Sequence, residues 1–429
     1  MMAKYYLDTV GCRLNQSEIE IYARQLRAAG HTLVADPADA DVAIVNTCMV
    51  TAAASADSRK KIRHIARAGT QSIMVTGCWA SLKPEDARAL PNVSQVVFNC
   101  EKDDLVAKIL KIDKQAFDLE FIAREPIPGS RARTRAFIKV QDGCNNKCTY
   151  CVTTVARGKS VSRTEKAILA DIRAAQQGGS QEIVLTGVHM GSWGYDFDRP
   201  RHLRDLIETV LAETDVPRLR LSSLEPWDLD EGFLRLWEDP RLARHLHLPL
   251  QSGCKKTLRR MARKITPEAF ARLVKSARKA IPGIAITTDI IVGFPGEDET
   301  EFEQSLAFVE AMDFAGGHVF TYSPRPFTAA ATMPNQVLYE TRKMRNKIVQ
   351  DVIAQSSRRY RSGFLGKRIS VLWESAKQEA DGSWLLSGLS DNYLRIHARA
   401  GESLWNRFSV VKPDTLTEKG LIGKIETET

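Results

Sequence analysis

The sequence predicts an α/β protein built from an open parallel sheet, a partial (β/α)6 barrel and a small all-β domain. Three observations support this prediction. Short apolar runs alternate with helical patterns over about the first 110 residues, which is the rhythm of a parallel sheet covered on both faces. Six further β/α units follow between residues 136 and 322. Roughly the last 65 residues alternate with a period of two between Asp-Gly and Ala-Gly turns.

The first domain, residues 1–115, is predicted to form the open sheet. Its strands are expected at Tyr5–Thr9, Val42–Asn46, Ser72–Thr76 and Ser94–Phe98. Its helices are expected at Gln16–Ala29, Ala52–Ala68, Pro84–Ala89 and Lys102–Leu110. Residues 116–132, which contain prolines, a glycine and arginines, are predicted to be a linker.

The second domain, residues 133–362, is predicted to be the partial barrel. Its strands are expected at Phe137–Val140, Glu182–Thr186, Arg218–Ser222, His245–Pro249, Ala285–Val292 and Gly317–Tyr322. Helical patterns include Thr164–Gln177, Leu203–Glu213, Pro267–Ala280 and the charged stretch Leu338–Arg361. In such barrels the active site lies at the C-terminal ends of the strands.

The third domain, residues 363–429, is predicted to be a small all-β barrel or sandwich. Its strands are expected at Arg368–Trp373, Trp384–Leu389, Leu394–Ala398 and Arg407–Val411. Nine basic and nine acidic residues make it neutral. Judged by charge alone, this domain is therefore expected to bind RNA poorly.

Composition points to a soluble cytoplasmic protein. The chain has 429 residues, of which 43% are hydrophobic and 26% charged. No stretch approaches the ~20 apolar residues of a membrane span, and the first residues lack the apolar core of a signal peptide. We therefore expect no membrane partner. In a reducing compartment, eight cysteines favour metal binding or catalysis over disulfides.

The net charge of +9 is concentrated in three segments. Residues 124–173 hold eleven Lys/Arg against four acidic residues, residues 255–279 ten against one, and residues 341–368 nine against one. Any one segment could be a solvated helix face. Three in one chain favour a polyanionic partner, and RNA is the first candidate.

Cys144, Cys148 and Cys151 follow a C-x3-C-x2-C pattern just after the first predicted barrel strand. Thiolates at this spacing surround a soft metal centre, and three ligands suit a [4Fe–4S] cluster with one open iron. The alternative is a structural zinc loop. Zinc usually takes four ligands, and no fourth Cys or His lies within twenty residues.

A second trio, Cys12, Cys48 and Cys78, lies in the first domain. Each cysteine comes just after a predicted parallel strand, so all three are expected at the same edge of the sheet, where open α/β sheets bind ligands. The alternative is three unrelated buried thiols. The repeated position favours a second three-thiolate cluster. Cys100 and Cys254 are expected to be structural.

Four segments at predicted strand ends favour a small molecule bound at the barrel rim. They are Thr186–Gly194, Leu221–Pro226, His247–Gln251 and Asp289–Glu297. The glycines of Thr186–Gly194 allow the polar end of a ligand to approach the backbone closely. Each segment could also be a simple βα connection. For His189, His245 and His247, packing or hydrogen bonding is expected rather than acid–base catalysis.

These motifs resemble the radical S-adenosylmethionine (SAM) superfamily, and the upstream trio resembles its methylthiotransferases. The resemblance covers nearly the whole chain and implies a Rossmann/flavodoxin-like first domain, a radical SAM barrel and a TRAM-like β domain. Four segments are similar to the enzymes that act on N6-threonylcarbamoyladenosine in tRNA. They are Gly11–Glu18, Ile138–Cys151, Ala156–Gly158 and Val319–Ser323.

The resemblance implies two [4Fe–4S] clusters and SAM as cofactors of an alkylthio-group transferase. The cluster on Cys144, Cys148 and Cys151 would cleave SAM to a radical that takes hydrogen from C2 of adenosine-37. The cluster on the other trio would supply sulfur. An unactivated C–H bond has no acidic proton, so a cofactor must carry this chemistry. SAM contacts are expected from Tyr150, Gly187, Ser223, Glu225, Gln251, Ile291 and Gly293.

The expected partners are the tRNA anticodon stem-loop and a reductant such as a flavodoxin or ferredoxin, with the chain acting as a monomer. Three alternatives stay open at this point. Two are methylthiotransferases, one acting on isopentenyladenosine in tRNA and one on an aspartate of ribosomal protein S12. The third is a zinc-stabilised RNA-binding protein without catalysis.

Overall fold

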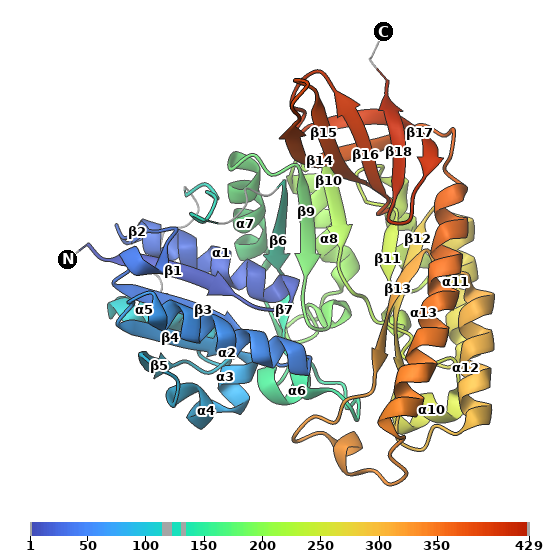
Figure 1. Cartoon of the computed structure of the whole chain (residues 1–429), viewed down its shortest axis with the longest axis horizontal. Helices are drawn as coiled ribbons and strands as arrows, with labels where there is room; N and C mark the ends of the chain where they lie inside the picture. Colours follow the sequence, from blue (N-terminus) through green and yellow to red (C-terminus); the bar gives the residue numbers. More distant parts are fainter. Residues whose placement is uncertain (1, 114–121, 130–133, 427–429) are drawn as a thin grey trace. The chain divides into compact units, whose positions relative to one another are not determined.

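The computed structural model describes residues 2–113, 122–129 and 134–426 (Figure 1). Most of the predicted linker, residues 116–132, lies outside these ranges. The chain divides into two compact units. Unit 1 comprises residues 1–147, 151–180 and 185–201, and unit 2 comprises residues 148–150, 181–184 and 202–429. Each unit is described by itself.

Unit 1 contains the predicted open sheet, with strand order β2-β1-β3-β4-β5 and parallel pairing throughout. Its strands are β1 (Lys4–Thr9), β2 (Thr32–Leu33), β3 (Val42–Thr47), β4 (Ser72–Gly77) and β5 (Val93–Val96). Its helices are α1 (Arg13–Ala28), α2 (Ala52–Arg67), α3 (Cys78–Leu82), α4 (Pro84–Arg88) and α5 (Leu105–Leu110). The three-residue 3₁₀ turns η1 (Pro37–Asp39) and η2 (Lys102–Asp104) complete the connections.

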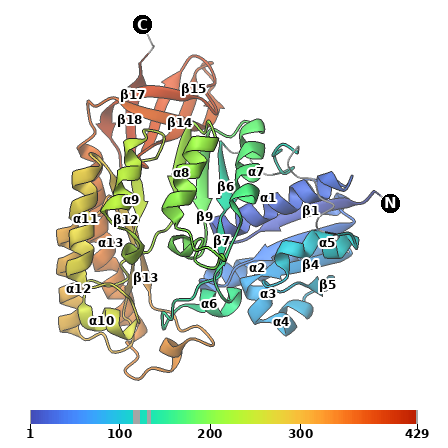
Figure 2. The same cartoon turned by 180° about the vertical axis from the view of Figure 1, so that it is seen from behind.

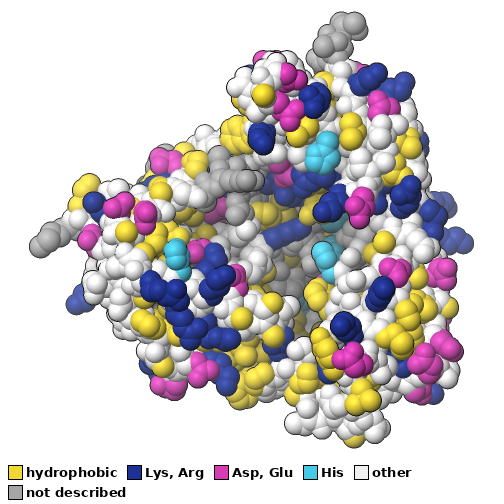
Figure 3. Space-filling view, viewed as in Figure 1, with side chains coloured by type: hydrophobic (Ala, Val, Ile, Leu, Met, Phe, Trp, Pro, Cys, Tyr) yellow, Lys and Arg dark blue, Asp and Glu magenta, His cyan; other side chains and the backbone are white. Residues whose placement is uncertain are grey.

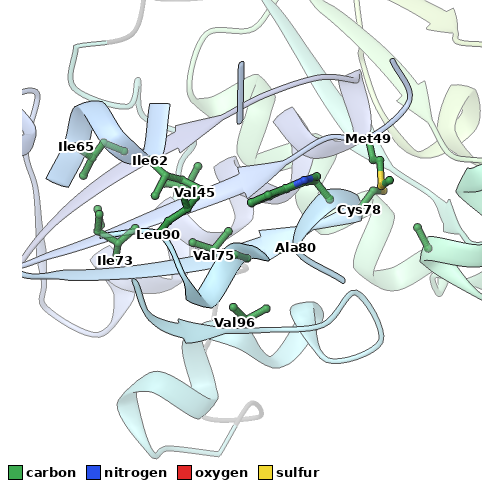
Figure 4. Packing of buried hydrophobic residues seen from close by; sticks show 14 residues of the cluster. Val45, Met49, Ile62, Ile65, Ile73, Val75, Cys78, Ala80, Leu90 and Val96 are labelled. Carbon is green, nitrogen blue, oxygen red and sulfur yellow. The ribbon is translucent and has the colours of Figure 1, made fainter. Parts of the chain in front are cut away.

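Helices cover both faces of this sheet. On one face, Ile19, Tyr22 and Leu26 of α1 pack with strand residues and with α5. On the other face, Ile62 and Ile65 of α2 join α3, α4 and the strands in one apolar cluster (Figure 4). This arrangement confirms the predicted parallel α/β domain.

Three local features differ from the predictions. The two-residue strand β2 and the short helix α3 were not expected, because neither contains enough residues to set up a periodic pattern. The last strand is Val93–Val96 rather than Ser94–Phe98. The helix predicted at Lys102–Leu110 begins as the 3₁₀ turn η2 and becomes α-helical at Leu105.

The predicted barrel strands form two three-stranded sheets, β10-β9-β6 and β11-β12-β13. The strands are β6 (Arg135–Lys139), β9 (Glu182–Thr186), β10 (Arg218–Leu221), β11 (His245–His247), β12 (Ala285–Val292) and β13 (Gly316–Thr321). Isolated bridges, Leu219 to Leu242 and Ser223 to His247, run between β10 and β11. The six strands therefore follow the chain order of a partial barrel, as predicted.

The main helices of this region are α6 (Val152–Arg157), α7 (Glu165–Gln177), α8 (Leu203–Glu213), α9 (Glu231–Leu234), α10 (Lys255–Arg260), α11 (Pro267–Ala280), α12 (Glu299–Met312) and α13 (Tyr339–Ser362). In unit 2, α11, α12 and α13 run alongside β12 and β13 in both views (Figures 1 and 2). The short strands β7 (Gln141–Asp142) and β8 (Val161–Ser162) pair with each other near the cysteine loop. The remaining 3₁₀ turns are η4 (Met190–Ser192), η5 (Pro226–Asp228), η6 (Arg235–Glu238) and η7 (Ala329–Thr332).

The C-terminal segment forms a closed barrel with strand order β14-β15-β16-β18-β17. The strands are β14 (Ile369–Gln378), β15 (Trp384–Ser390), β16 (Arg395–Ala400), β17 (Phe408–Leu416) and β18 (Leu421–Ile425). This confirms the small all-β domain. In the same unit, the buried Arg220 pairs with Glu182 and also donates to the carbonyl of Ser390, which ties this barrel to β9 and β10.

Over the described ranges, the search for a helix long and apolar enough to cross a membrane found none.

Candidate active site

Three cysteines of unit 1 lie at the C-terminal ends of neighbouring strands. Cys12 comes after β1 and precedes α1, Cys48 follows β3 directly, and Cys78 begins α3 directly after β4. Because β1, β3 and β4 are adjacent and parallel, these ends share one edge of the sheet. The structure thus places the trio where the sequence predicted it.

Two glycines let the cysteine loops pack closely. Gly11 has φ +106°, and a Cβ there would lie 2.6 Å from Cys48 Sγ. Gly77 has φ +97°, and a Cβ there would lie 2.2 Å from the carbonyl oxygen of Thr47. Any side chain at either position would clash and would also be strained. Both glycines are therefore required by the geometry of this edge.

Within residues 2–113, 122–129 and 134–426, no group of three His, Cys, Asp or Glu side chains is arranged as it would be around one metal ion.

Burial shapes the chemistry of these thiols. Cys48 is 4% exposed, and burial raises the pKa of its thiol to about 11, with smaller contributions from the neighbouring Cys12 and Cys78. At neutral pH such a thiol is protonated unless a cation stabilises the thiolate. Iron ions supply that stabilisation, since metal ligation deprotonates cysteine. Buried, closely placed thiols of this kind fit a metal centre.

Buried charged side chains form one network in the same unit, and they are Glu18, Lys102, Lys139, Asp142 and Arg157. Glu18 lies 2.6 Å from Lys102 Nζ and 3.0 Å from Arg157 Nη1. Asp142 lies 2.9 Å from each of the three cations. Three buried cations thus face these two carboxylates and, toward the surface, the exposed Asp103.

The pKa values of the network follow from these contacts. Burial alone would raise the pKa of Glu18, but Lys102, Arg157 and Lys139 lower it to about 2. Asp103 also lies 2.8 Å from Lys139 Nζ, although it is largely exposed. At neutral pH the Glu18 carboxylate is therefore ionised.

Arg157 links the network to the first cysteine. Its Nη2 donates to Asn15 Oδ1 at 2.7 Å, and Cys12 Sγ lies 3.6 Å from the same oxygen. Burial alone would lower the pKa of Arg157, but Glu18 and Cys78 raise it well above its usual value, with further contributions from Asp142 and Cys12. The guanidinium stays charged, and this fixed positive charge suits an anionic, thiolate-ligated cluster.

The C-x3-C-x2-C loop is held by local hydrogen bonds within unit 1. The Cys144 backbone N–H donates to the Gly158 carbonyl at 3.0 Å, and the Asn146 N–H lies 3.4 Å from Cys144 Sγ. Gly143 has φ +67°, and a Cβ there would lie 1.8 Å from the Lys159 carbonyl oxygen. Thr154 Oγ1 lies 3.6 Å from Cys151 Sγ. Donors around both sulfurs fit thiolate ligands of a cluster.

In unit 2, a buried arginine contacts the middle cysteine of this motif. Arg263 Nη1 lies 3.8 Å from Cys148 Sγ, and its guanidinium stacks 4.5 Å from the centroid of the Trp227 ring. Both terminal nitrogens pair with Glu225, at 3.1 and 2.7 Å. Sequence reasoning missed Arg263, because it is one cation within a basic run and nothing in its spacing marks it as buried.

The predicted SAM contacts of unit 2 lie at the ends of its strands. Gln251 has φ +74°, and its carbonyl accepts from the Ile291 N–H at 2.8 Å. Gly293 has φ +68°, and its N–H donates to Glu297 Oε1 at 2.8 Å. The Tyr150 ring lies edge-on to Phe294, with 6.3 Å between centroids.

Three predicted contacts differ from this set. Ser223 is exposed and forms a bridge with His247. Glu225 binds Arg263 through both oxygens, so its carboxylate positions that arginine. Gly187 belongs to unit 1, where a Cβ would lie 3.0 Å from Gln141 Oε1. The assignment of these seven residues to SAM stays a prediction.

The histidines make hydrogen bonds, as expected. His245 and His247 both contact Thr287 Oγ1, at 3.0 and 2.9 Å. His189 Nδ1 lies 3.4 Å from Asn146 Nδ2, which places it beside the cysteine loop.

The two other cysteines differ from each other. Cys254 is buried, with its Sγ 3.4 Å from Gln304 Oε1, which fits a structural role. Cys100 is exposed and so has no packing role. Its neighbour Asn99 is the residue that reaches the site, with Nδ2 3.7 Å from Cys78 Sγ.

Comparisons with known proteins agree with this geometry. A model of the radical SAM superfamily matches residues 138–309, and a model of the uncharacterized protein family UPF0004 matches residues 4–99. The chain is 33% identical to the threonylcarbamoyladenosine tRNA methylthiotransferase MtaB of Bacillus subtilis, covering 96% of this chain and 94% of that protein. It is 35% identical to the protein of the same name from Thermotoga maritima, with coverage of 97% and 95%.

Other relatives are more distant in activity or sequence. The chain is 32% identical to the tRNA-2-methylthio-N(6)-dimethylallyladenosine synthase of Ehrlichia canis, covering 99% of this chain and all of that protein. Among solved structures, the radical SAM methyltransferase TsrM from Kitasatospora setae matches with a TM-score of 0.60 and 16% identity, over 77% of this chain and 75% of that one. The structural likeness supports the fold alone.

Proposed function

Because the chain belongs to the radical SAM methylthiotransferase family, we propose that it methylthiolates C2 of N6-threonylcarbamoyladenosine at position 37 of tRNA. Three relatives named for this substrate are 33–35% identical over nearly the whole chain. Relatives named for the dimethylallyl substrate reach 32%. The protein is a tRNA-modifying transferase of alkylthio groups, with SAM and [4Fe–4S] clusters as its cofactors.

The observation that carries the proposal is the presence of two cysteine trios with different positions in the fold. Cys12, Cys48 and Cys78 lie at the edge of the parallel sheet, where the buried thiols of Cys48 and Cys78, the exposed thiol of Cys12 and a fixed positive charge fit an anionic cluster. Cys144, Cys148 and Cys151 lie in one loop. We assign the first trio to the auxiliary cluster and the second to the radical-generating cluster.

When bound, the clusters and SAM supply a radical able to remove hydrogen from an unactivated C–H bond and the sulfur that replaces it. The side chains of the protein position these groups. Arg263 places a charged nitrogen beside Cys148 Sγ, and Glu225 holds the arginine there with two hydrogen bonds. Since hydrogen bonds to ligand sulfur tune the potential of a cluster, Arg263 is a positioning residue for that centre.

Several further assignments belong to this proposal. The tRNA is expected to present its base from the single-stranded anticodon loop, because base-directed recognition of RNA requires an unstacked base. The enzyme would act in the cytoplasm, where its tRNA substrate is found, as a monomer reduced by a flavodoxin or ferredoxin. SAM would contact Tyr150, Gly187, Ser223, Glu225, Gln251, Ile291 and Gly293, and Glu225 also holds Arg263 in place.

The test uses anaerobically purified protein, tRNA carrying N6-threonylcarbamoyladenosine, SAM and a chemical reductant. Wild-type protein should form the 2-methylthio nucleoside, detected by mass spectrometry of digested tRNA. Cys148→Ala should abolish SAM cleavage, whereas Cys48→Ala should retain cleavage and lose thiolation. Each variant should bind about half the wild-type iron and acid-labile sulfide.

Each alternative gives a different result. If Cys48→Ala still methylthiolates tRNA, the two-cluster assignment is wrong. If the purified protein contains stoichiometric zinc and no labile sulfide, it is an RNA-binding protein without this chemistry. If product forms only on isopentenyladenosine tRNA, or on an aspartate of ribosomal protein S12, the enzyme class stands and the substrate is wrong.

A further inference from the structure

Helix α2 of unit 1 carries a row of exposed cations that the sequence analysis did not single out. Lys60, Arg63 and Arg67 are exposed and lie three and four residues apart, on the side opposite the buried Ile62 and Ile65. These three cations are called the α2 basic face. Figure 3 shows Lys and Arg side chains gathered on unit 1 where α2 lies in Figure 1.

The other two cations of α2 have partners within the protein. Lys61 Nζ lies 2.6 Å from Asp8 Oδ1, and the Arg59 guanidinium lies 6.0 Å from the centroid of the Trp79 ring. No ion pair joins Lys60, Arg63 or Arg67 to an acidic side chain within residues 2–113, 122–129 and 134–426. The α2 basic face therefore presents its charge to solvent.

This arrangement is unfavourable for the helix alone. Like charges three or four residues apart destabilise a helix by about 0.2–0.5 kcal/mol for each pair, and the face contains two such pairs. Arg67 gains from the helix dipole, because it lies in the last turn. Lys60 lies two turns earlier and has no such gain, but the exposed Asp57 three residues before it offsets part of the repulsion. Repulsion of this kind is relieved when an external anion binds between the cations.

Some cations in the basic runs found by sequence are engaged in internal contacts. In residues 255–279, Arg260 pairs with Glu301, and Arg278 donates to the carbonyls of Met312 and Asp313. In residues 341–368, Arg345 pairs with the buried Glu297. A count of charges along the chain does not separate paired from free cations, so those runs overstate the charge available to RNA.

The α2 basic face also has a suitable position. Helix α2 begins four residues after Cys48, with the Thr51 side chain accepting from the Ala54 N–H at 3.0 Å. At 1.5 Å per residue, Lys60 lies about 12 Å along the helix from Ala52, and Arg67 about 10 Å farther. The face is therefore about 10 Å long, which is enough to contact more than one backbone phosphate.

We propose that the α2 basic face binds backbone phosphates of the tRNA whose base is modified at the Cys12, Cys48 and Cys78 edge. This inference rests on the proposed function. The contact adds affinity without reading sequence, because phosphates carry no base information. The N-terminal sheet domain would then bind the RNA backbone in addition to carrying the sulfur-donating cluster.

The test measures binding of holoenzyme to a synthetic anticodon stem-loop that carries N6-threonylcarbamoyladenosine, over a range of salt concentrations. The variant K60Q/R63Q/R67Q removes the three charges. Its binding should be at least about tenfold weaker at 0.1 M salt, and the slope of log K against log salt should fall by about 2–3, or about 0.7–0.9 for each lost contact. The control K60R/R63K/R67K keeps every charge and should bind as wild type does.

Three results would overturn the inference. The first is an unchanged salt slope in the Gln variant, while wild-type holoenzyme still binds and methylthiolates the stem-loop; the proposed function would then stand. The second is equal weakening in the Gln variant and the charge-retaining control, since that would mean a loss of structure. The third is a wild-type holoenzyme that neither binds nor modifies the RNA, which would remove the proposed function as well.

Discussion

The buried charge network predicts a large and asymmetric response to the loss of one carboxylate. Glu18 is 1% exposed and faces Lys102, Lys139 and Arg157. The substitution Glu18→Gln keeps the shape of the side chain, including an oxygen that can accept the hydrogen bond Asn46 Nδ2 now donates to Glu18 Oε2 at 2.9 Å. It leaves the three buried cations with Asp142 as their one largely buried carboxylate. Removing a partner from a buried ion pair leaves an uncompensated charge, which typically costs about 3–5 kcal/mol.

The pKa of Glu18 gives an independent magnitude. It lies at about 2, compared with 4.5 for a free glutamate. A difference of about 2.5 pKa units, at 1.36 kcal/mol for each, corresponds to about 3 kcal/mol of stability at neutral pH. For a unit of this size, that lowers the melting temperature by roughly 6–12 °C. Differential scanning calorimetry of wild type and Glu18→Gln measures this shift directly.

Two comparisons make the prediction specific. Arg88→Met breaks an exposed pair with Glu85 and should change stability by less than about 1 kcal/mol. Adding Lys102→Met to Glu18→Gln removes one excess cation and should recover part of the loss, about 1–3 kcal/mol. A Glu18→Gln loss below about 1 kcal/mol, or strictly additive effects in the double variant, would refute the assignment of a coupled buried network.

The remaining predictions concern pH and the two cysteine sites. In metal-free protein, wild type should be more stable than Glu18→Gln by its full margin above about pH 4.5, and the margin should vanish as the pH falls toward 2. The reason is that a carboxylate with a lowered pKa stabilises the folded state only while it is ionised. Acid-unfolding curves of the two proteins measure this margin. Arg263→Met should lower the reduction potential of the radical-generating cluster, since it removes a positive charge beside Cys148 Sγ, and a redox titration followed by EPR detects the shift. Gly77→Ala should lower the free energy of unfolding by at least about 1–3 kcal/mol, because the new Cβ would lie 2.2 Å from the Thr47 carbonyl oxygen and the backbone has φ +97°. The variant should also bind less iron, although residue 77 is not itself a proposed ligand. An iron content equal to that of wild type would contradict this prediction.

The sequence predicted much of the fold because long apolar and amphipathic periods are local signals. Strands β9 and β12 and helices α8 and α11 have the predicted bounds. The short elements β2 and α3 were missed, since tertiary packing forms them without a periodic pattern. The positions of the cysteines could be inferred because each follows a recognisable strand.

The supporting side chains could not be predicted in the same way, because their partners are distant in the sequence. Arg263 contacts Glu225, 38 residues away, and Cys148, 115 residues away. Lys102 and Glu18 lie near opposite ends of the N-terminal sheet domain in the sequence, yet they form an ion pair. Such pairs depend on how chain segments pack, and no spacing rule records them. The α2 basic face was missed for a different reason. Its three cations lie close together in the sequence, but they are too few to stand out as a basic run.

The network also shows how the two cysteine motifs depend on each other within unit 1. Asp142 lies two residues before Cys144, and Arg157 lies six residues after Cys151. Both join Glu18, six residues after Cys12, in one set of ion pairs. A substitution at Arg157, which follows the C-x3-C-x2-C motif, would therefore change the charge beside Cys12. Within unit 1, the segments that carry Cys144 and Cys151 and the edge that carries Cys12 are thus joined by the same buried charges, so these proposed ligands are not positioned independently.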